Sequence, residues 1–285
     1  MSKKEILVLG GTGKVGSRVV AQLQERGVPV RAASRSGRTR FDWDDESTWG
    51  PAVEGVDAAF VVCLEGRSDS SQLARAFVEF AVSKGVRRLV LLSARGVENH
   101  QDLLVPEQSV RASGAEWTIL RPSWFAQNFT ELPLFTAAIE AGELALPTGD
   151  GLEPFIDAED IAAVGVAALT EEGHAGQTYE MTGPRLLTFE TAVQEIATAT
   201  GREVRFVTLE PEEYTARLSA LGASGDEIML MDGLFAAIRE GRQAHLSDGV
   251  PRALGREPRD FGAYVERVAV EDAHRRAGTD SARPA

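Results

Sequence analysis

The heptapeptide Gly10-Gly11-Thr12-Gly13-Lys14-Val15-Gly16 constrains the fold more than any other feature of this 285-residue chain. It follows a short apolar run, residues 5–9, and precedes residues 14–26, whose apolar side chains recur at helical spacing. Glycines permit a tight turn and let another group approach the main chain closely. A strand, a glycine loop and a helix in this order are typical of the first unit of a dinucleotide-binding sheet.

Apolar strands and amphipathic helices then alternate along the first half of the chain. We predict strands at 28–33, 56–63, 88–93 and 117–120, and helices at 14–26, 72–84 and from Pro106 to Gly114. Proline is favoured at the first position of a helix, so Pro106 is expected to open the last of these. The alternation predicts an α/β fold with a Rossmann-like, doubly wound parallel sheet covered on both faces.

The second half is less regular and indicates a smaller α/β C-terminal substrate domain. We predict strands at 177–182 and 204–209, and helices at 157–169, 188–200, 211–221 and 225–241. The expected division is a dinucleotide-binding domain at 1–150, with a sheet contribution from about 155–183, a substrate-side domain at 184–270 and a flexible tail at 271–285.

Composition excludes several classes of protein. The net charge of −13 argues against nucleic-acid binding, and no apolar run approaches the length of a membrane span. No secretory signal is visible, so we expect a cytoplasmic protein. A single cysteine excludes an internal disulfide, and His174 and His245 lack partners at metal-ligand spacing, so no metal is expected. A homodimer is the assembly we consider, with the Met-rich segment at 227–235 as core or interface.

The glycine loop predicts how a dinucleotide is held and of which kind. Its free N–H groups and the positive end of the following helix would bind a pyrophosphate. An NAD site would carry Asp or Glu at the end of the second strand, whereas this chain has Ser34 and Arg35. Residues 1–50 carry nine Lys/Arg against six Asp/Glu in an otherwise acidic chain. We therefore expect NADPH, with Arg35 on the 2′-phosphate and Ser34, Arg38 and Lys14 assisting. A solvated basic loop is the alternative.

Three further residues are candidates near the coenzyme. Asp42 and Trp43 are placed to flank the adenine, although Trp43 equally suits core packing. Cys63 ends a predicted strand at the same sheet edge and is included among the coenzyme contacts. Its thiol is expected to be buried and inert.

Several motifs together resemble one family: GGTGKVG, SRS, FDW, LLSARG, SGAEWTILRPSWFAQNF, FIDAEDIA and YEMTGPRLLTFETA. They are similar to the NmrA-like group of atypical short-chain dehydrogenases/reductases, over about residues 5–265. The resemblance implies a Rossmann-like domain with a smaller substrate domain. It also implies NADPH-dependent reduction of quinones or azo dyes, or dinucleotide binding without turnover in a regulator.

The usual catalytic site of short-chain reductases is a Ser with Tyr-x-x-x-Lys. Ser93 sits where that serine is expected, but no Tyr precedes Tyr179 and no Lys follows Lys84, so the motif is missing. Reduction of an ordinary ketone, which requires a proton donor, is therefore disfavoured. His100 is a candidate donor, with an exposed loop histidine as the alternative. Glu107 is expected to be a helix-start residue facing the dipole.

The segment after the strand at 117–120 is aromatic and suits a flat substrate. Candidate substrate contacts are Trp124, Phe125, Asn128, Phe129 and Phe155. A hydrophobic seam between domains is the alternative for the same residues. Asp157 and Asp160 are interpreted as a helix cap and its third residue rather than a catalytic carboxylate pair.

These expectations lead to one function and two alternatives. The leading hypothesis is an NADPH-dependent oxidoreductase that transfers hydride to a conjugated aromatic acceptor, quinone-like or azo, as a small-molecule substrate. One alternative is a non-catalytic NADP(H)-binding redox sensor or regulator. The other is a tailoring reductase of a polyketide-type aromatic intermediate.

Overall fold

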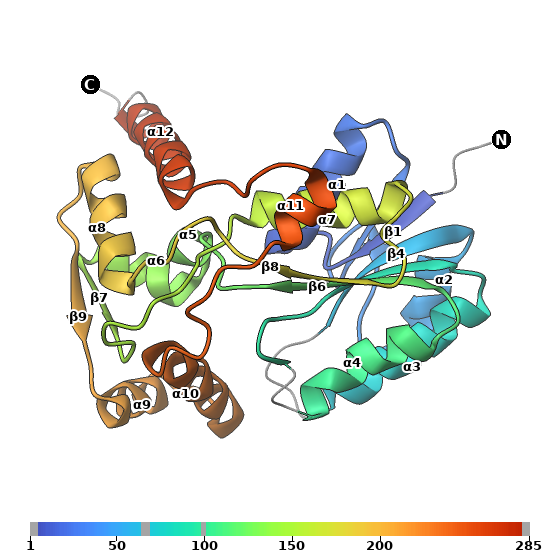
Figure 1. Ribbon diagram of the computed structural model, residues 1–285, viewed down its shortest axis with the longest axis horizontal. Helices are drawn as coiled ribbons and strands as arrows, with labels where there is room; N and C mark the ends of the chain where they lie inside the picture. The colour runs from blue at the N-terminus through green and yellow to red at the C-terminus, as the bar shows by residue number, and fades with distance from the viewer. Residues whose placement is uncertain (1–4, 64–68, 98–100, 281–285) are drawn as a thin grey trace. The chain divides into compact units, whose positions relative to one another are not determined.

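The computed structural model describes residues 5–63, 69–97 and 101–280, which form two compact units (Figure 1). The first unit contains the described residues up to Ser123, together with Ala158–Thr182 and Ser247–Glu257. The second contains Trp124–Asp157, Gly183–Leu246 and the described residues from Pro258 onward.

A parallel sheet of seven described strands forms the centre of the first unit, in the order β3-β2-β1-β4-β5-β6-β8. Every neighbouring pair is parallel. The strands are β1 (Glu5–Leu9), β2 (Val30–Ser34), β3 (Thr39–Arg40), β4 (Val56–Val62), β5 (Arg88–Leu92), β6 (Glu116–Pro122) and β8 (Gln177–Met181). The predicted Rossmann-like parallel sheet is confirmed, and its carboxyl ends lie along one edge.

Helices cover both faces of this sheet (Figure 1). One face carries α1 (Lys14–Glu25), α7 (Ala158–Thr170) and α11 (Gly249–Leu254). The other carries η1 (Glu46–Thr48), α2 (Trp49–Val53), α3 (Ser70–Ser83) and α4 (Gln101–Ala112). Strand residues such as Leu7, Leu9 and Phe60 are fully buried because helices shield them on either side.

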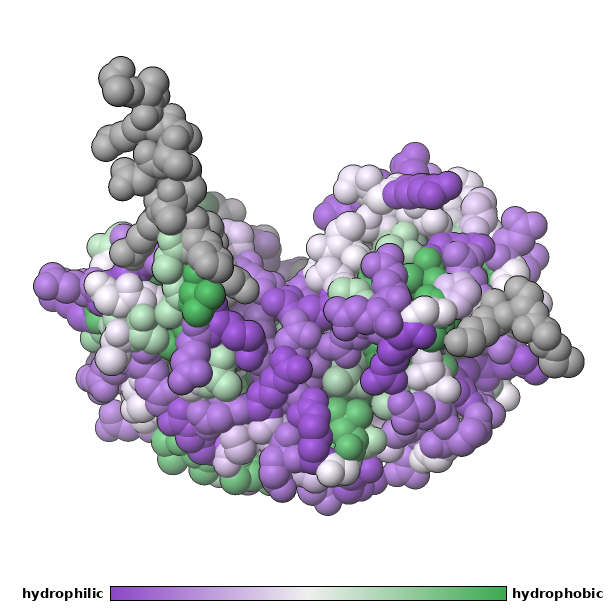
Figure 2. Space-filling view, turned by 90° about the horizontal axis from the view of Figure 1, so that it is seen from above, coloured by the Kyte–Doolittle hydropathy of each residue, from purple (hydrophilic) through white to green (hydrophobic). Residues whose placement is uncertain are grey.

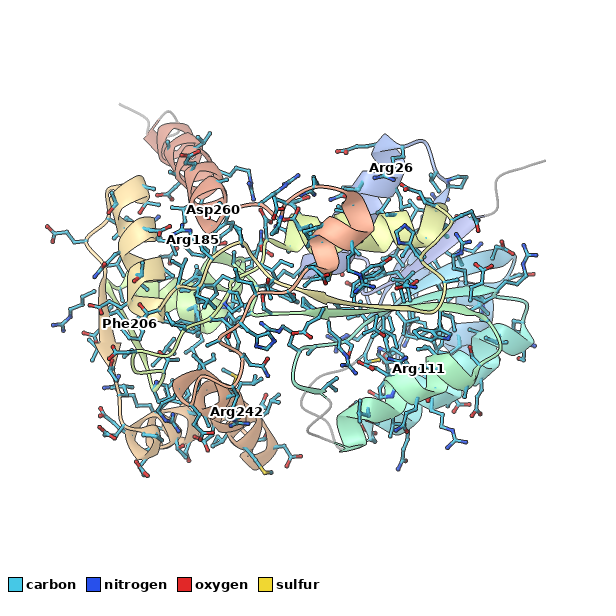
Figure 3. All side chains as sticks on the ribbon, viewed as in Figure 1. Arg26, Arg111, Arg185, Phe206, Arg242 and Asp260 are labelled. Atoms are coloured by element: carbon cyan, nitrogen blue, oxygen red, sulfur yellow. The ribbon has the colours of Figure 1, made fainter. Side chains whose placement is uncertain are left out.

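The second unit packs helices and a small sheet around an aromatic core. Its elements are α5 (Asn128–Glu131), α6 (Pro133–Glu140), β7 (Glu143–Leu146), α8 (Phe189–Thr200), β9 (Arg205–Thr208), α9 (Pro211–Ala220), α10 (Gly225–Arg239) and α12 (Phe261–Asp280). Strands β7 and β9 pair in parallel. Arg185 joins α8 to the start of α12, because its guanidinium contacts Glu195 at 2.7 Å and Asp260 at 2.7 Å (Figure 3).

The helix predicted to open at Pro106 begins earlier. Pro106 lies inside α4, which starts at Gln101. A proline in a helix loses one N–H donor and strains the preceding turn, but its φ is helical, and residues 101–105 continue the helix before it. Glu107 is consequently in the middle of α4 rather than at a helix start, and the expectation that it faces the dipole is wrong.

The units also divide the chain differently from the predicted domains. Residues 124–157 belong to the second unit because Phe129, Phe135 and Phe155 pack in its aromatic core with Phe189. Residues 247–257 return to the first unit, where the Ser247 hydroxyl donates to the Glu180 carbonyl at 2.8 Å.

The tail predicted from residue 271 is helical as far as the structure describes it. Helix α12 continues through Asp280. Asp272 is only 6% exposed, and its carboxylate accepts a hydrogen bond from Arg202 at 2.6 Å. This ion pair fixes the helix beyond the point where the polar sequence suggests fraying.

Hydrophilic residues dominate the face of the molecule in Figure 2, with hydrophobic residues in small patches. Within the described ranges, no helix is both long enough and apolar enough to cross a membrane.

Candidate functional site

The β1–α1 loop presents main-chain N–H groups at the carboxyl edge of the sheet. Gly10 adopts a φ of +62°, a left-handed conformation that favours glycine. The turn is closed by the Gly13 N–H, which donates to the Gly10 carbonyl at 2.8 Å. Gly13 is the N-cap of α1 and offers no side-chain cap, and the first turn of α1 has no acidic residue. The helix N-terminus is therefore available to an anion.

Two glycines of the same loop pack too closely against their neighbours to carry a side chain. A β-carbon at Gly16 would lie 2.2 Å from the Gly10 carbonyl oxygen, and one at Gly11 would lie 2.9 Å from the Ala32 β-carbon. Thr12 and Gly13 remain exposed at the tip. Such a tight glycine turn with an exposed tip, here called the glycine cradle, fits the pyrophosphate of a dinucleotide. It brings together the predicted residues from Gly10 to Gly16.

Positive charge lies beside this loop at the end of β2. Arg35 and Arg38 are exposed, and neither pairs with a carboxylate among the described residues. The Ser34 hydroxyl oxygen is buried with no hydrogen-bond partner in the described part of the chain, and a β-carbon at Gly37 would lie 2.7 Å from it. Lys14, at the start of α1, is half-buried.

Other arginines in this region have structural roles. The guanidinium of Arg31 contacts Glu5 and donates to the carbonyls of Ala52 and Glu54 at 2.9 and 2.8 Å, which caps the end of α2. Arg40 lies 3.5 Å from Asp45. The unpaired charge near β2 is therefore on Arg35 and Arg38.

The other three predicted coenzyme contacts, Asp42, Trp43 and Cys63, lie in different surroundings. Trp43 is 8% exposed, and its ring packs edge-on against Phe41 and Phe77. These contacts favour core packing over a contact with adenine. The Asp42 carbonyl accepts a hydrogen bond from the Trp49 indole at 3.0 Å. Cys63 follows β4 directly instead of lying within it and is half-buried.

A buried carboxylate that the sequence misplaced lies next to Ser93. Ser93 follows β5 directly, and its hydroxyl donates to Oε1 of Glu107 at 2.7 Å. Glu107 is 1% exposed, and Arg121 of β6 donates to both of its oxygens at 2.8 and 2.7 Å. Arg111, which Figure 3 labels on α4, lies one helical turn further along, and its guanidinium is 3.5 Å from the Glu107 carboxylate. Two features of the sequence could have indicated this cluster. Glu107 and Arg111 are four residues apart on a helix, and Arg121 directly follows an apolar strand.

The arginines keep the Glu107 carboxyl group ionised. Burial alone would raise its pKa, but the hydrogen bonds from Arg121 and Ser93 outweigh burial and lower the pKa below the ordinary value. His100, the other catalytic candidate, lies outside the described residues.

The substrate candidates lie in the second unit and differ in exposure. Phe129 and Phe155 are fully buried, with ring centroids 5.3 Å apart, so they belong to the core. Trp124, Phe125 and Asn128 are half-buried. The Trp124 indole nitrogen is buried with no hydrogen-bond partner among the described residues.

The two aspartates near α7 each meet an arginine. Asp157 precedes α7 and accepts hydrogen bonds from Arg267 and from Gln127, the latter at 2.7 Å. Asp160, in the first turn of α7, accepts from Arg256 at 2.6 Å. These contacts indicate structural carboxylates, as the sequence suggests.

The Glu107 cluster generates a prediction about stability and pH. Glu107→Gln removes an ionised partner of Arg121, and we expect it to lower the free energy of unfolding by about 1–3 kcal/mol at pH 7. A lowered folded-state pKa gives stabilisation that is complete above the ordinary value of 4.5 and is lost as the pH falls through the lowered one. Denaturant titrations should show the difference from the unmodified protein shrinking below about pH 4.5.

The matched control is Glu79→Gln, in the exposed pair of α3 with Arg75. That change should alter the free energy of unfolding by no more than about 0.5 kcal/mol. A Glu107→Gln effect equally small at pH 7 would contradict the role given to the buried cluster.

Comparisons with known proteins agree with this geometry. A family model described as NAD(P)H-binding matches residues 10–172. The chain is 34% identical over 273 residues to the uncharacterized oxidoreductase YesF of Bacillus subtilis (strain 168), covering 93% of this chain and 95% of the relative. It is 33% identical over 284 residues to the NAD(P)H azoreductase of Xenophilus azovorans, covering 93% and 98%.

Solved structures share the fold. The NADPH-dependent quinone oxidoreductase QOR2 of Escherichia coli, complexed with NADPH, matches with a TM-score of 0.78 and 22% identity, covering 92% of this chain and 99% of that one. NmrA, a negative transcriptional regulator in complex with NAD, matches with a TM-score of 0.74 and 17% identity, covering 96% and 98%. The resemblance to NmrA-like proteins is thereby confirmed, and the chain belongs to the NAD(P)H-binding family of Rossmann-like proteins.

Proposed function

We propose that this protein is an NADPH-dependent oxidoreductase that transfers hydride to a conjugated aromatic acceptor of the quinone or azo class. The observation that carries the proposal is the glycine-rich turn between Gly10 and Gly16, in which β-carbons at Gly11 and Gly16 would collide with neighbouring atoms. The full-length relatives support it, since they include an oxidoreductase and an azoreductase. When bound, the reduced coenzyme supplies the hydride, and the chain positions the two reactants.

The cradle generates the first test. Gly13→Asp places a carboxylate at an exposed position on the helix N-terminus, where it would repel a pyrophosphate. We expect NADPH affinity measured by calorimetry to fall at least about 100-fold, which is ~2.7 kcal/mol, with little change in melting temperature. NADPH consumption with a quinone panel and an azo dye should fall to background.

Gly50→Ala is the matched control. Gly50 lies in α2, and a β-carbon there would meet nothing within 4 Å. This variant should bind NADPH normally and turn over the same acceptors. The acceptor proposal fails if the unmodified protein consumes no more NADPH than Gly13→Asp with every acceptor.

The proposed preference for NADPH over NADH rests on the basic edge after β2. Arg35 and Arg38 are exposed cations without a described carboxylate partner, and the neighbouring Ser34 hydroxyl is buried without a hydrogen-bond partner among described residues. A 2′-phosphate would accept hydrogen bonds from the arginine guanidinium groups and from the Ser34 hydroxyl.

Arg35→Ala should reduce the ratio of NADPH to NADH affinity by about tenfold or more, because a charge-assisted contact with phosphate is worth ~1.5–3 kcal/mol. Arg75→Ala, an exposed arginine of α3 that pairs with Glu79, should leave the ratio unchanged. If both variants keep the same ratio as the unmodified protein, the phosphate contact is not at Arg35.

We propose a conjugated acceptor because no proton donor has been identified among the described residues of the chain. The sequence holds no Tyr-x-x-x-Lys, and the proton of the Ser93 hydroxyl points to Glu107. A ketone would have to form a basic alkoxide without a donor, whereas a reduced quinone or azo group delocalises its charge and takes its proton from water. Positioning of the two reactants then supplies most of the rate enhancement.

Trp124 is the residue proposed to contact the acceptor. It is half-buried, and its indole N–H is unsatisfied within the described residues, at a site where its ring lies 5.5 Å from Phe235. Trp124→Ala should lower kcat/KM for the acceptor by about tenfold or more while leaving NADPH affinity within twofold, since aromatic contacts contribute ~0.5–1.5 kcal/mol beyond the apolar area they bury. Steady-state kinetics and calorimetry measure the two effects.

Phe129→Leu, a substitution in the fully buried core, is the control for loss of packing. It should affect melting temperature more than acceptor selectivity. Equal loss of acceptor use and NADPH affinity in Trp124→Ala would indicate a folding role for Trp124 instead.

A dinucleotide-binding regulator is the second candidate, favoured by the structural likeness to NmrA. The same cradle would serve both functions. A regulator would distinguish oxidised from reduced coenzyme by affinity and would consume no NADPH with any acceptor of the panel.

A further inference from the structure

The Ser93 hydroxyl lies at the same edge of the sheet as the glycine cradle. β5 ends at Leu92, β1 ends at Leu9, and only β4 separates these parallel strands. Ser93 is half-buried, and its main-chain N–H donates to the Leu120 carbonyl at 2.8 Å. The main chain is therefore held by the sheet, and only the hydroxyl can turn.

The direction of the Ser93 hydroxyl is set by its neighbours. A serine has a single O–H to donate and two lone pairs that accept. Oε1 of Glu107 lies 2.7 Å from the Ser93 oxygen, and Arg121 donates to both oxygens of that carboxylate. An ionised carboxylate only accepts, so the proton between the two groups comes from Ser93.

We propose, resting on the proposed function, that Glu107 is a positioning residue which fixes Ser93 as a hydrogen-bond acceptor for an N–H or O–H group of the bound reactants. The chemical class recognised is a neutral donor. Two sources present one: the carboxamide N–H of a nicotinamide, and a hydroxyl group on the hydride acceptor. Ser93 does not protonate the acceptor, because its proton is held by Glu107.

Burial of Glu107 stabilises the hydrogen bond that Ser93 donates to it. Glu107 is 1% exposed, so water does not compete for its oxygens, and Arg121 balances its charge. Releasing the Ser93 proton toward a ligand would leave one carboxylate oxygen without that hydrogen bond in a desolvated site. The lowered pKa of Glu107 agrees with a carboxylate that stays ionised at neutral pH.

Glu107→Gln should invert the polarity of Ser93. Arg121 and Arg111 both direct an N–H group at Oε2, so the glutamine oxygen should take that position and the amide NH₂ should lie beside Ser93. The Ser93 oxygen then accepts from the glutamine, and its proton turns outward. The variant converts Ser93 from an acceptor into a donor for ligands without removing the hydroxyl.

The first experiment compares two coenzymes by calorimetry: NADP⁺, whose carboxamide donates, and its 3-acetylpyridine analogue, whose acetyl group only accepts. We expect the unmodified protein to prefer NADP⁺ about three- to tenfold more strongly than Ser93→Ala does, as one neutral hydrogen bond allows. Ser93→Thr, which retains the hydroxyl, should restore the preference. Glu107→Gln should abolish or reverse it.

The second experiment assigns the donor to the hydride acceptor if the first shows no difference. It compares kcat/KM for 2-hydroxymethyl- and 2-methoxymethyl-1,4-naphthoquinone, because the alcohol of the first stays un-ionised and can donate. The same variants should move this ratio in the same order. Ser109→Ala is the control, since the Ser109 hydroxyl donates to the Val105 carbonyl within α4. It should leave both ratios unchanged.

Melting temperatures of all variants establish that they fold. Should Glu107→Gln fail to fold, Glu107→Asp keeps the charge but retracts the carboxylate from Ser93, and it should lower whichever ratio Ser93→Ala lowers. The proposal is overturned if neither ratio differs between the unmodified protein and Ser93→Ala, or if the Glu107 variant leaves both unchanged. Absence of NADP⁺ binding by the unmodified protein would instead defeat the proposed function.

Discussion

The close approach of Gly16 to the Gly10 carbonyl oxygen is the constraint on which the candidate site depends. It lets α1 start directly against the end of β1, with a glycine N-cap that brings no side chain onto the helix N-terminus. Gly11 packs on Ala32 in the same way and thereby ties the loop to β2. Since Ser34 ends β2, one set of backbone contacts positions both the pyrophosphate cradle and the basic edge beside it.

The distribution of paired charges explains how an acidic chain binds an anion. Several of its buried carboxylates meet arginines, as in the pairs of Glu107 with Arg121 and of Asp160 with Arg256, because an uncompensated buried charge is costly. These arginines are engaged in structure and contribute little to a ligand. Arg35 stands apart, since it is exposed and has no carboxylate partner among the described residues. Positive charge without a described partner is therefore available at the edge of the sheet where we propose that a 2′-phosphate binds.

The sequence predicted the elements of local origin and missed those made by long-range packing. Apolar periodicity located the strands of the large sheet, and the glycine pattern located the tight turn between β1 and α1. Residues 124–157 join the second unit only through ring contacts such as that of Phe155 with Phe189, which no local pattern reveals. Glu107 was misplaced because Pro106 favours a helix start, and its true role depends on Arg121, fourteen residues away on another element.

The direction of the Ser93 hydroxyl proton limits which reduction the chain can assist. A reductase that protonates its substrate needs a donor whose hydrogen points at the reacting atoms, whereas the hydrogen of Ser93 points at Glu107. The acceptor must then accommodate the incoming electron pair without a proton from the chain, and the chain must hold the two reactants in contact. Conjugated acceptors meet the first demand without assistance. In the function that we propose, the buried carboxylate selects a class of substrate without contacting it, because it determines what Ser93 can donate.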